Sequence, residues 1–529
     1  MKPTKFLNSL MLPLVCAGFI LGSCTKKYAE INTDRNTIAT IGAAELPFLF
    51  ARAQKEATPS IWNYQIAQNL FADQYAQYIA NTATYFPSDR LVIRMDWVGA
   101  AFNPIYTDVV PQLQTIFEAA DPASAEYALA NVLWVQAFHR VTDYWGPIPY
   151  FQAGIPGNAV PYDPQDKIYD DFFKRLTAAV TVLNGKKTEK PYGDFDIMYA
   201  GDVNKWIKFA NTLRLRLAMR ISKVDPGRAK TEAEAAVAAA SGGVLTESPG
   251  DDAYVKRSEV GQDNNGLSIM SDWNEFRMSA SMESVLKGYS DPRMPVYFLP
   301  AQKTGTFEGH RNGLTSTEQT LDINKADANS HVGPRWTNAD IYPGGIKGHL
   351  ATPQNVMATA EAYFLRAEGA LLGWNMGGTA KQFYEDGITN SMKQWGITNT
   401  ATINNYINST ATPVAPNDFL NSPPMTNIPV KFDAANVAIQ REQIALQKWL
   451  AIFPDGHEAW ADYRRSRVLK LYPVAHSDNP DITNTTTQWI RRIPFLESEK
   501  QNNKAEVDKA VGLLGGPDKV TTPLWWDKN

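Results

Sequence analysis

The chain has 529 residues, of which 44% are hydrophobic and 11% aromatic, and this is ample for a large folded core. Its 51 basic and 55 acidic side chains give a net charge of -4, so the concentrated positive charge of a nucleic-acid-binding protein is missing. The only cysteines are Cys16 and Cys24, which excludes thiolate metal sites and cysteine catalysis in the rest of the chain.

The N-terminus has the pattern of a secretory lipoprotein signal. Two lysines precede an apolar run over residues 10–20, which is too short to span a membrane. Residues 21–24, Leu-Gly-Ser-Cys, follow directly and resemble the bacterial lipobox. We therefore expect a lipoprotein signal peptide over residues 1–23 and lipidation, with palmitate or a similar acyl chain, at Cys24. A plain signal peptide, with an incidental cysteine, is the alternative.

Helical periodicity dominates the chain after the N-terminal segment. Apolar residues recur every three or four positions over residues 127–145, 168–183 and 206–221, and glycine or proline follows each stripe. The sequence also predicts helices over residues 229–240, 356–372, 380–395 and 434–453. Repeated antiparallel pairs of this length indicate tetratricopeptide-like hairpins, and an unrelated helical bundle is the alternative.

Two regions lack this periodicity. Residues 244–353 are rich in Gly, Asn, Asp, Ser and Pro, and Asn81 to Ala100 form a second irregular segment. Long irregular regions inside a folded chain usually carry function or are poorly ordered, and the aromatic residues in both regions favour order.

Motifs of the common enzyme classes are missing. The chain has no dinucleotide-binding glycine fingerprint, no phosphate-binding Walker loop and no G-x-S-x-G elbow. His457-Glu458 begins like a zinc-protease helix, but Ala461 occupies the position of the second histidine. The sequence therefore favours a binding protein without catalytic residues or a cofactor, and a glycan hydrolase is the weaker alternative.

Acidic and basic side chains also have structural interpretations. Glu361 and Glu368 lie two helical turns apart and are interpreted as partners of arginines rather than as an acid/base pair. A basic set on the third stripe is interpreted as a helix face that pairs with carboxylates: Lys205, Lys208, Arg214, Arg216 and Arg220. Structural calcium is possible but not supported by an EF-hand motif at four oxygen-bearing side chains: Asp322, Asn324, Asp327 and Asn329.

Several sequence runs occur in the order expected for a known family. The first is Arg-Val-Thr-Asp-Tyr-Trp-Gly-Pro-Ile-Pro at residues 140–149, and a late one is Glu-Ala-Trp-Ala-Asp-Tyr-Arg-Arg at residues 458–465. Together the runs resemble the SusD/RagB family of nutrient-binding outer-membrane lipoproteins, in particular its SusD-like branch. The other matching runs are residues 162–163 with 168–169, 206–221, 360–368, 447–453, 491–495, 515–518 and 524–527.

The resemblance implies a mostly α-helical fold. It implies a single SusD-like domain over residues 24–529, with about four tetratricopeptide-like hairpins and a long irregular, loop-rich lobe at about 244–353. It also implies capture of an oligosaccharide, or less often a peptide, at the cell surface. The ligand would pass to a SusC-like TonB-dependent barrel transporter in the outer membrane. A helical-repeat scaffold that binds another envelope protein is the alternative.

The ligand site is predicted where the Asn81–Ala100 loop meets the 244–353 region. Aromatic residues in polar, glycine-rich surroundings have no helical stripe to explain them, and flat rings stack on sugars. The alternative is that such rings fill small local cores, above all Trp97, because Phe102 and Ile105 could continue a stripe with it. The ring candidates are Tyr85, Trp97, Trp273 and Trp336, and the hydrogen-bonding candidates are Asp96, Asn274 and Arg277.

Overall fold

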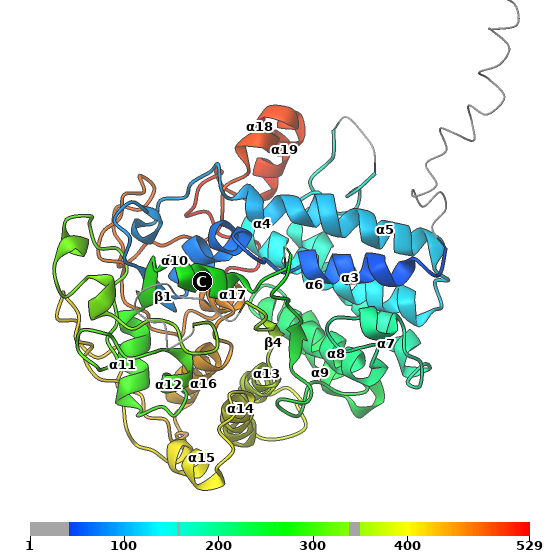
Figure 1. Ribbon diagram of the computed structural model, residues 1–529. Helices are drawn as coiled ribbons and strands as arrows, with labels where there is room; N and C mark the ends of the chain where they lie inside the picture. The colour runs from blue at the N-terminus through cyan, green and yellow to red at the C-terminus, as the bar shows by residue number, and fades with distance from the viewer. Residues whose placement is uncertain (1–41, 156–158, 262, 338–349, 529) are drawn as a thin grey trace, which may run out of the picture. The chain divides into compact units, whose positions relative to one another are not determined.

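The computed structural model describes residues 42–155, 159–261, 263–337 and 350–528 (Figure 1). The predicted signal peptide and the lipidation site Cys24 lie outside the described residues. The chain divides into two units, Met1–Leu46 and Pro47–Asn529. The described part of the first unit is a turn in which the backbone N–H of Gly42 donates to the Glu45 carboxylate at 2.7 Å. All further description concerns the second unit.

The second unit is mostly helical, as predicted. The three apolar stripes form helices, and side chains cap the first and the third of them: the Ser124 side chain accepts the backbone N–H of Tyr127, and Asp202 caps the third. Asp225 caps the helix that follows. The consecutive pairs α6/α7 and α8/α9 pack side by side, with α7 against α8, at the right of Figure 1. Their bounds are α6 Ala125–Trp145, α7 Gln165–Asn184, α8 Val203–Arg220 and α9 Pro226–Val237.

The later helices form a second group, in which α13 and α14 pack together and α16 packs against both. The prediction of one helix over residues 356–372 was wrong at its start. Gln354–Met357 form strand β4, which pairs with β2 (Ala253–Val255). The helix begins only where the Asp252 carboxylate accepts the backbone N–H of Thr359 at 2.7 Å. The helices are α13 Thr359–Leu371, α14 Ala380–Gln394, α15 Thr400–Ile407, α16 Val437–Ala451 and α17 Gly456–Ser466.

The described residues of the 244–353 region are largely irregular, as predicted, but they also form short helices and strands. The antiparallel pair of β1 and β3 joins this region to the segment before the Asn81–Ala100 loop. The remaining elements are α3 Leu46–Glu56, the π-helices η1 Gln65–Asp73 and η3 Ile105–Val109, β1 Ile79–Asn81, α4 Gly99–Pro104, α5 Val110–Ala119, α10 Gly266–Trp273, β3 Phe276–Met278, α11 Ala280–Gly288, α12 Met294–Tyr297, α18 Glu497–Asn502, α19 Lys504–Leu513 and the 3-10 turns η2 Ser88–Arg90, η4 Gly193–Phe195, η5 Ala239–Ser241, η6 Glu318–Thr320 and η7 Ala326–Ala328.

A buried network of charged side chains ties the helical groups together. The Arg216 guanidinium on α8 forms two hydrogen bonds with the Glu361 carboxylate on α13, at 2.7 and 2.6 Å, and both side chains are almost fully buried. Arg220 pairs with Glu458 on α17 at 2.5 Å and with Asp143 on α6 at 3.2 Å. These pairs confirm the interpretation of Arg216 and Arg220 as partners of carboxylates, whereas the Lys205 ammonium lies 6.0 Å from the centre of the Tyr199 ring.

Other members of this helix face and its neighbours are paired in the same way. The Arg465 guanidinium donates to both oxygens of Glu368 at 2.7 Å, so Glu368 is an arginine partner as predicted. The Lys448 ammonium and the Arg465 guanidinium both lie 2.7 Å from the same oxygen of Asp462, Oδ1. The outer pairs are Lys208 with Asp251 at 2.8 Å and Arg214 with Glu232 at 2.6 Å.

Candidate functional site

The two irregular segments meet, as the sequence predicts. Asn81 and Phe276 are paired across β1 and β3, and the backbone N–H of Thr82 donates to the Glu275 carbonyl at 2.9 Å. The Gln319 side chain adds a hydrogen bond to the carbonyl of Asn81 at 2.9 Å. The backbone of the Asn81–Ala100 loop is therefore fixed against the 244–353 region at its first residues.

Glu275 lies at the centre of this junction. Its carboxylate accepts hydrogen bonds from the Tyr85 hydroxyl and, at 2.5 Å, from the Gln65 side chain on η1. Tyr85 is 67% exposed although its hydroxyl is hydrogen-bonded to Glu275. Burial and the Glu275 carboxylate raise the pKa of Tyr85 to about 12, which keeps the hydroxyl neutral. Tyr85 thus presents a flat face in a fixed place.

Trp273 ends α10 and lies two residues before Glu275. Its side chain is 44% exposed. Asn274 terminates the helix in the left-handed conformation, with φ 61°, and its side chain is exposed. The ring of Trp273 and the amide of Asn274 therefore both reach the surface close to Glu275.

Arg277, in contrast to Trp273 and Asn274, is buried and holds neighbouring backbone segments together. It is 1% exposed, and its guanidinium donates to the carbonyls of Ala326 and Phe276, each at 2.7 Å, and to the Asn274 side chain. A strand position facing the interior, next to several carbonyls, explains its burial. We therefore do not retain Arg277 as a ligand-binding candidate.

Trp97 and Asp96 are organised around Arg94. The Arg94 guanidinium lies 4.4 Å above the centre of the Trp97 ring and pairs with the Asp96 carboxylate at 2.8 Å. The edge of Trp97 packs against Phe86 at 5.8 Å between ring centres. One face of this half-buried tryptophan is therefore already covered by a cation, which leaves less ring for a ligand than at Tyr85 or Trp273.

Trp336 fills a local core. It is 3% exposed and packs against Trp395 and Phe453, with ring centres 5.8 and 5.7 Å apart. Both partner rings come from the helical groups, so the ring closes the gap between an irregular segment and the scaffold. Trp336, like Arg277, has no open surface in this structure, and we do not retain it as a candidate.

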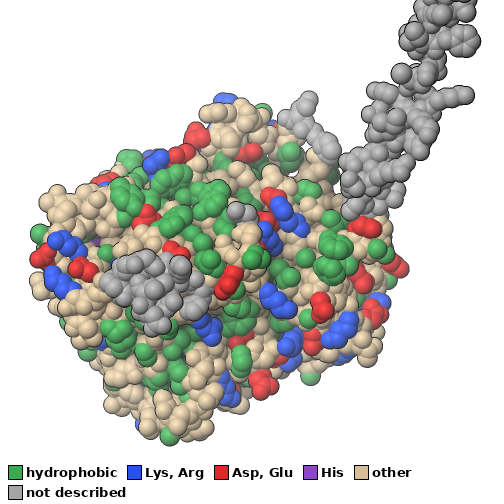
Figure 2. Space-filling model, in the orientation of Figure 1, with side chains coloured by type: hydrophobic (Ala, Val, Ile, Leu, Met, Phe, Trp, Pro, Cys, Tyr) green, Lys and Arg blue, Asp and Glu red, His purple; other side chains and the backbone are tan. Residues whose placement is uncertain are grey.

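Trp62 is a surface ring that the sequence analysis missed. It is 51% exposed and stands one turn before Gln65, whose backbone N–H donates to the Trp62 carbonyl at 3.1 Å. Ile61, just before it, has φ 45°, an unusual conformation for a β-branched residue. The signal in the sequence was a tryptophan two residues after Pro59-Ser60, a pair typical of a break between helices. Figure 2 shows hydrophobic side chains gathered between the positions that α4 and α10 occupy in Figure 1.

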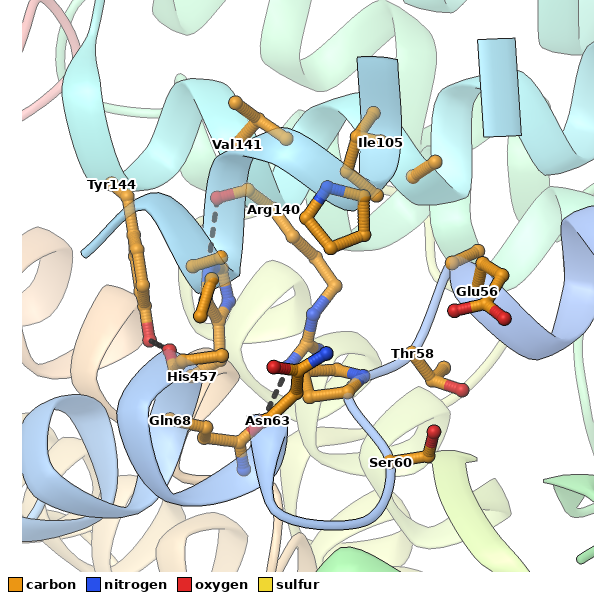
Figure 3. A pocket seen from close by; sticks show the side chains of 17 residues that line it. Glu56, Thr58, Ser60, Asn63, Gln68, Ile105, Arg140, Val141, Tyr144 and His457 are labelled. Atoms are coloured by element: carbon orange, nitrogen blue, oxygen red, sulfur yellow. Dashed lines mark hydrogen bonds between the residues drawn. The ribbon is translucent and has the colours of Figure 1, made fainter. Parts of the chain in front are cut away.

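A small recessed pocket lies beside Trp62, since Ser60 and Asn63 line it (Figure 3). Its volume is about 40 Å³, room for a few waters. Arg140 crosses the pocket and is held by Asp455 at 3.1 Å and by the Gln68 side chain at 2.9 Å. The charge in this pocket is thus already paired within the protein.

His457 lines the same pocket. Its Nε2–H donates to the carbonyl of Arg140 at 2.8 Å. Burial and the nearby Arg140 cation hold the pKa of His457 well below its usual range, so the imidazole is neutral. The helix start that resembled a zinc protease is therefore a packing element: the His457 ring stacks on Tyr144 at 4.5 Å.

Within the described ranges, no group of three or more acidic, histidine or cysteine side chains is placed to hold a metal ion. At the calcium candidates, Asp322 pairs with Lys325 at 2.7 Å, and the amides of Asn324 and Asn329 donate to backbone carbonyls. None of the helices in the described part of the chain combines the length and apolar character needed to cross a bilayer.

Comparison with known proteins places this geometry in a family. The family model of the SusD-like SusD and RagB outer membrane lipoproteins matches residues 26–527. A chitin-binding SusD homologue from Flavobacterium johnsoniae is 36% identical, with a TM-score of 0.81 over 92% of this chain and 99% of its own. A SusD-like protein from Bacteroides thetaiotaomicron is 32% identical, with a TM-score of 0.78 over 92% and 99%.

A SusD homologue from Bacteroides vulgatus is 30% identical, with a TM-score of 0.80 over 91% of this chain and 98% of its own. No curated protein matches the chain. The match extends over nearly the whole sequence and the fold follows that of the solved homologues. The chain therefore belongs to the SusD/RagB family of outer membrane lipoproteins.

Proposed function

We propose that the protein captures a neutral oligosaccharide at the surface around Glu275 and passes it to a SusC-like TonB-dependent transporter. The observation that carries the binding site is that three exposed rings lie on segments that meet at the Glu275 carboxylate, which bonds Tyr85 and Gln65. Trp62 lies one turn before Gln65, Tyr85 donates to Glu275, and Trp273 lies two residues before it. Exposed rings on segments that other contacts fix in place suit stacking on sugar rings.

The chemistry around Glu275 favours binding over hydrolysis. The carboxylate is engaged by a tyrosine hydroxyl and a glutamine amide, whereas a glycosidase needs a second carboxyl group at a set distance across the scissile bond. A few ring contacts of roughly 0.5–1.5 kcal/mol each, with some hydrogen bonds, give only about millimolar to micromolar affinity. Such affinity suits a protein that must also release its ligand.

Chitin-type oligosaccharides are the first ligands to test, because the 36% identical Flavobacterium homologue is a chitin-binding protein. Calorimetric titration with chitohexaose should give measurable binding, and maltohexaose and a mixed peptide pool serve as competing ligand classes. Chromatography of the mixture afterwards should show intact ligand. Appearance of shorter products, abolished by one Asp or Glu substitution, would replace this proposal by a hydrolase.

Alanine variants test the place of binding. Trp62→Ala, Tyr85→Ala and Trp273→Ala should each weaken affinity by about twofold to tenfold, the loss of one ring contact. Phe151→Ala, at an exposed ring on a different segment, is the matched control and should bind as the wild type does. If all three variants bind the ligand as tightly as Phe151→Ala does, the ligand does not bind at this surface.

The anchor and the transporter partner are tested separately. We infer an acyl anchor at Cys24, so Cys24→Ala should leave the protein soluble, and mass spectrometry should find the acylated residue. Extraction in mild detergent should recover a large barrel protein in near-equal amounts. Recovery of the lipoprotein alone in several detergents would favour the scaffold alternative. Protease shaving of intact cells tests whether the protein faces outward.

A further inference from the structure

A second cavity lies away from the exposed rings of the proposed surface site. It is enclosed by the segment after η1, by α17 and by the chain around residues 471–474 and 485–490, and its volume is about 100 Å³. A single water needs only about 10–15 Å³ of cavity, so the space holds several waters or one small organic molecule. The lining residues are Gln74, Tyr75, Gln77, Leu91, Trp460, Tyr463, Leu471, Tyr472, Pro473, Val474, Thr485, Thr486, Gln488, Trp489 and Ile490.

No charged side chain is among these lining residues, in contrast to the pocket crossed by Arg140. Aromatic rings supply much of the wall: the rings of Tyr75 and Trp460 are 5.1 Å apart, and those of Tyr463 and Trp489 are 6.3 Å apart. The rest of the wall consists of amides, hydroxyls and aliphatic side chains. Such a surface disfavours an ion, which would enter without a partner, and suits a neutral molecule with an apolar face.

Three glutamines line the cavity, and two of them build its wall. The Gln77 side chain donates to the carbonyl of Tyr472 at 2.6 Å, and the Gln488 side chain accepts the backbone N–H groups of Thr483 and Asn484 at 2.8 and 3.0 Å. Gln74 differs. It is 3% exposed, and neither its amide oxygen nor its amide nitrogen has a hydrogen-bond partner within the described part of the chain.

Two further residues that line this cavity also carry a buried polar atom without a hydrogen-bond partner in the described part of the chain. The Tyr75 hydroxyl and the Trp489 indole nitrogen are buried, and neither has a hydrogen-bond partner among the described residues. Burial raises the pKa of Tyr75 well above its usual range, so its hydroxyl stays neutral. Buried polar groups of folded proteins are nearly always satisfied, by protein, water or ligand. The three residues that carry these atoms, Gln74, Tyr75 and Trp489, all line this one small cavity.

We propose that this cavity is a second binding site, separate from the surface rings, which accepts one neutral sugar unit or a free neutral monosaccharide. A sugar offers the hydroxyl donors and acceptors that Gln74, Tyr75 and Trp489 lack, and an apolar ring face for the aromatic wall. The open hollow formed by residues 475–485 adjoins the cavity, since Thr485 lines both, and provides the way in. The proposal rests on the chemistry of the cavity and not on the function of the surface site.

Thermal denaturation of the full mature chain tests the proposal, with glucose, galactose and N-acetylglucosamine as neutral probes and glucuronate and glucosamine as charged counterparts. Neutral probes should raise the melting temperature, because a ligand that binds only the folded state stabilises it, and charged probes should not. An absence of any shift with the neutral probes, or an equal shift with the charged ones, would overturn the proposal.

Two variants connect the shift to the cavity. Gln74→Met keeps the length of the side chain and removes the unpartnered amide, so the unliganded melting temperature should hold or rise while apparent affinity falls about tenfold. Trp489→Phe keeps an aromatic ring and removes the indole N–H, and its apparent affinity for the sugar should also fall. This variant provides the test if Gln74→Met does not fold. An unchanged response in the folded variants, or a sugar-soaked crystal with only water in the cavity, would refute the assignment.

A surface variant separates this proposal from the proposed function. Trp273→Ala should keep the monosaccharide response, and Trp489→Phe should keep chitohexaose binding if that ligand lies at the surface. If Trp273→Ala loses the rise in melting temperature with monosaccharides while Gln74→Met keeps it, the sugar binds at the surface rings. That result would refute the proposal that the cavity is a binding site.

Discussion

The helical scaffold and the junction around Glu275 treat polar and aromatic side chains in opposite ways. In the scaffold, Arg216 and Glu361 are buried and paired, so the charges stabilise packing. At the junction, the polar contact between Tyr85 and Glu275 holds a ring that stays open to solvent. The difference teaches that charged residues within helices are poor indicators of a ligand-binding site in this protein. Exposed rings that one polar contact holds in place are better indicators.

The largest expected effect is a loss of stability when the buried ion-pair network of the helical scaffold is disrupted. Arg216→Ala leaves the Glu361 carboxylate buried without its main partner and should lower the free energy of unfolding by about 3–5 kcal/mol. Lys230→Ala is the control, because Lys230 and Glu234 form an exposed pair at 3.9 Å and contribute about 0.5 kcal/mol or less. Chemical denaturation measures both. Equal, small losses would show that the buried network is dispensable.

The second prediction applies one substitution to both regions. Trp336→Ala removes a ring packed between Trp395 and Phe453 and should cost about 3–5 kcal/mol of stability. Trp273→Ala removes a ring that is 44% exposed and should change stability by less than about 1 kcal/mol. Melting temperatures of the two variants give the comparison. A Trp273→Ala protein that melts as early as Trp336→Ala would make Trp273 a core residue.

The third and smallest prediction uses pH. Asp73 accepts hydrogen bonds from Tyr64 at 2.8 Å and Gln68 at 3.0 Å, and burial raises its pKa from 3.8 to about 7. Its folded pKa exceeds its unfolded one, so its stabilisation is full below about pH 4 and is lost as pH rises through about 7. Between these values the wild type should lose about 1–3 kcal/mol relative to Asp73→Asn.

Denaturant titrations of both proteins from pH 4 to pH 8 measure that difference. Asp462 is the natural contrast: despite its burial, Lys448 and Arg465 hold its pKa well below the usual range, so it carries its charge throughout this window. Parallel pH curves for the wild type and Asp73→Asn would show that Asp73 is ionised in the folded protein across the whole range.

The sequence predicted the long helices well because their physics is local. Periodic apolar residues and an N-terminal cap at Ser124 specify α6 without knowledge of its neighbours. The start of α13 was wrong for a non-local reason: Gln354–Met357 pair with a strand about one hundred residues earlier in the chain. A strand of four residues directly before a helix is too short to show an alternating pattern of apolar residues in the sequence.

The site was predictable as a meeting of segments but not as a set of residues. Trp273 and Trp336 have similar polar, irregular surroundings in sequence, and only Trp395 and Phe453, far along the chain, make one of them a core ring. Arg277 was similarly indistinguishable from a ligand-binding arginine until the backbone carbonyls around it were placed. Trp62 was missed because its neighbour Gln65 is joined to Glu275, which lies 210 residues further along the chain.

The hydrogen bonds of Glu275 have a consequence for the time at which the site forms. Its partners Gln65 and Tyr85 are 210 and 190 residues distant in sequence, so the junction closes only after long loops have been brought together. Contacts of such separation form slowly and late in folding. A chain emerging into the cell envelope would thus have no arranged set of rings until its fold is nearly complete, and glycan binding would appear as a late event that follows native structure in time.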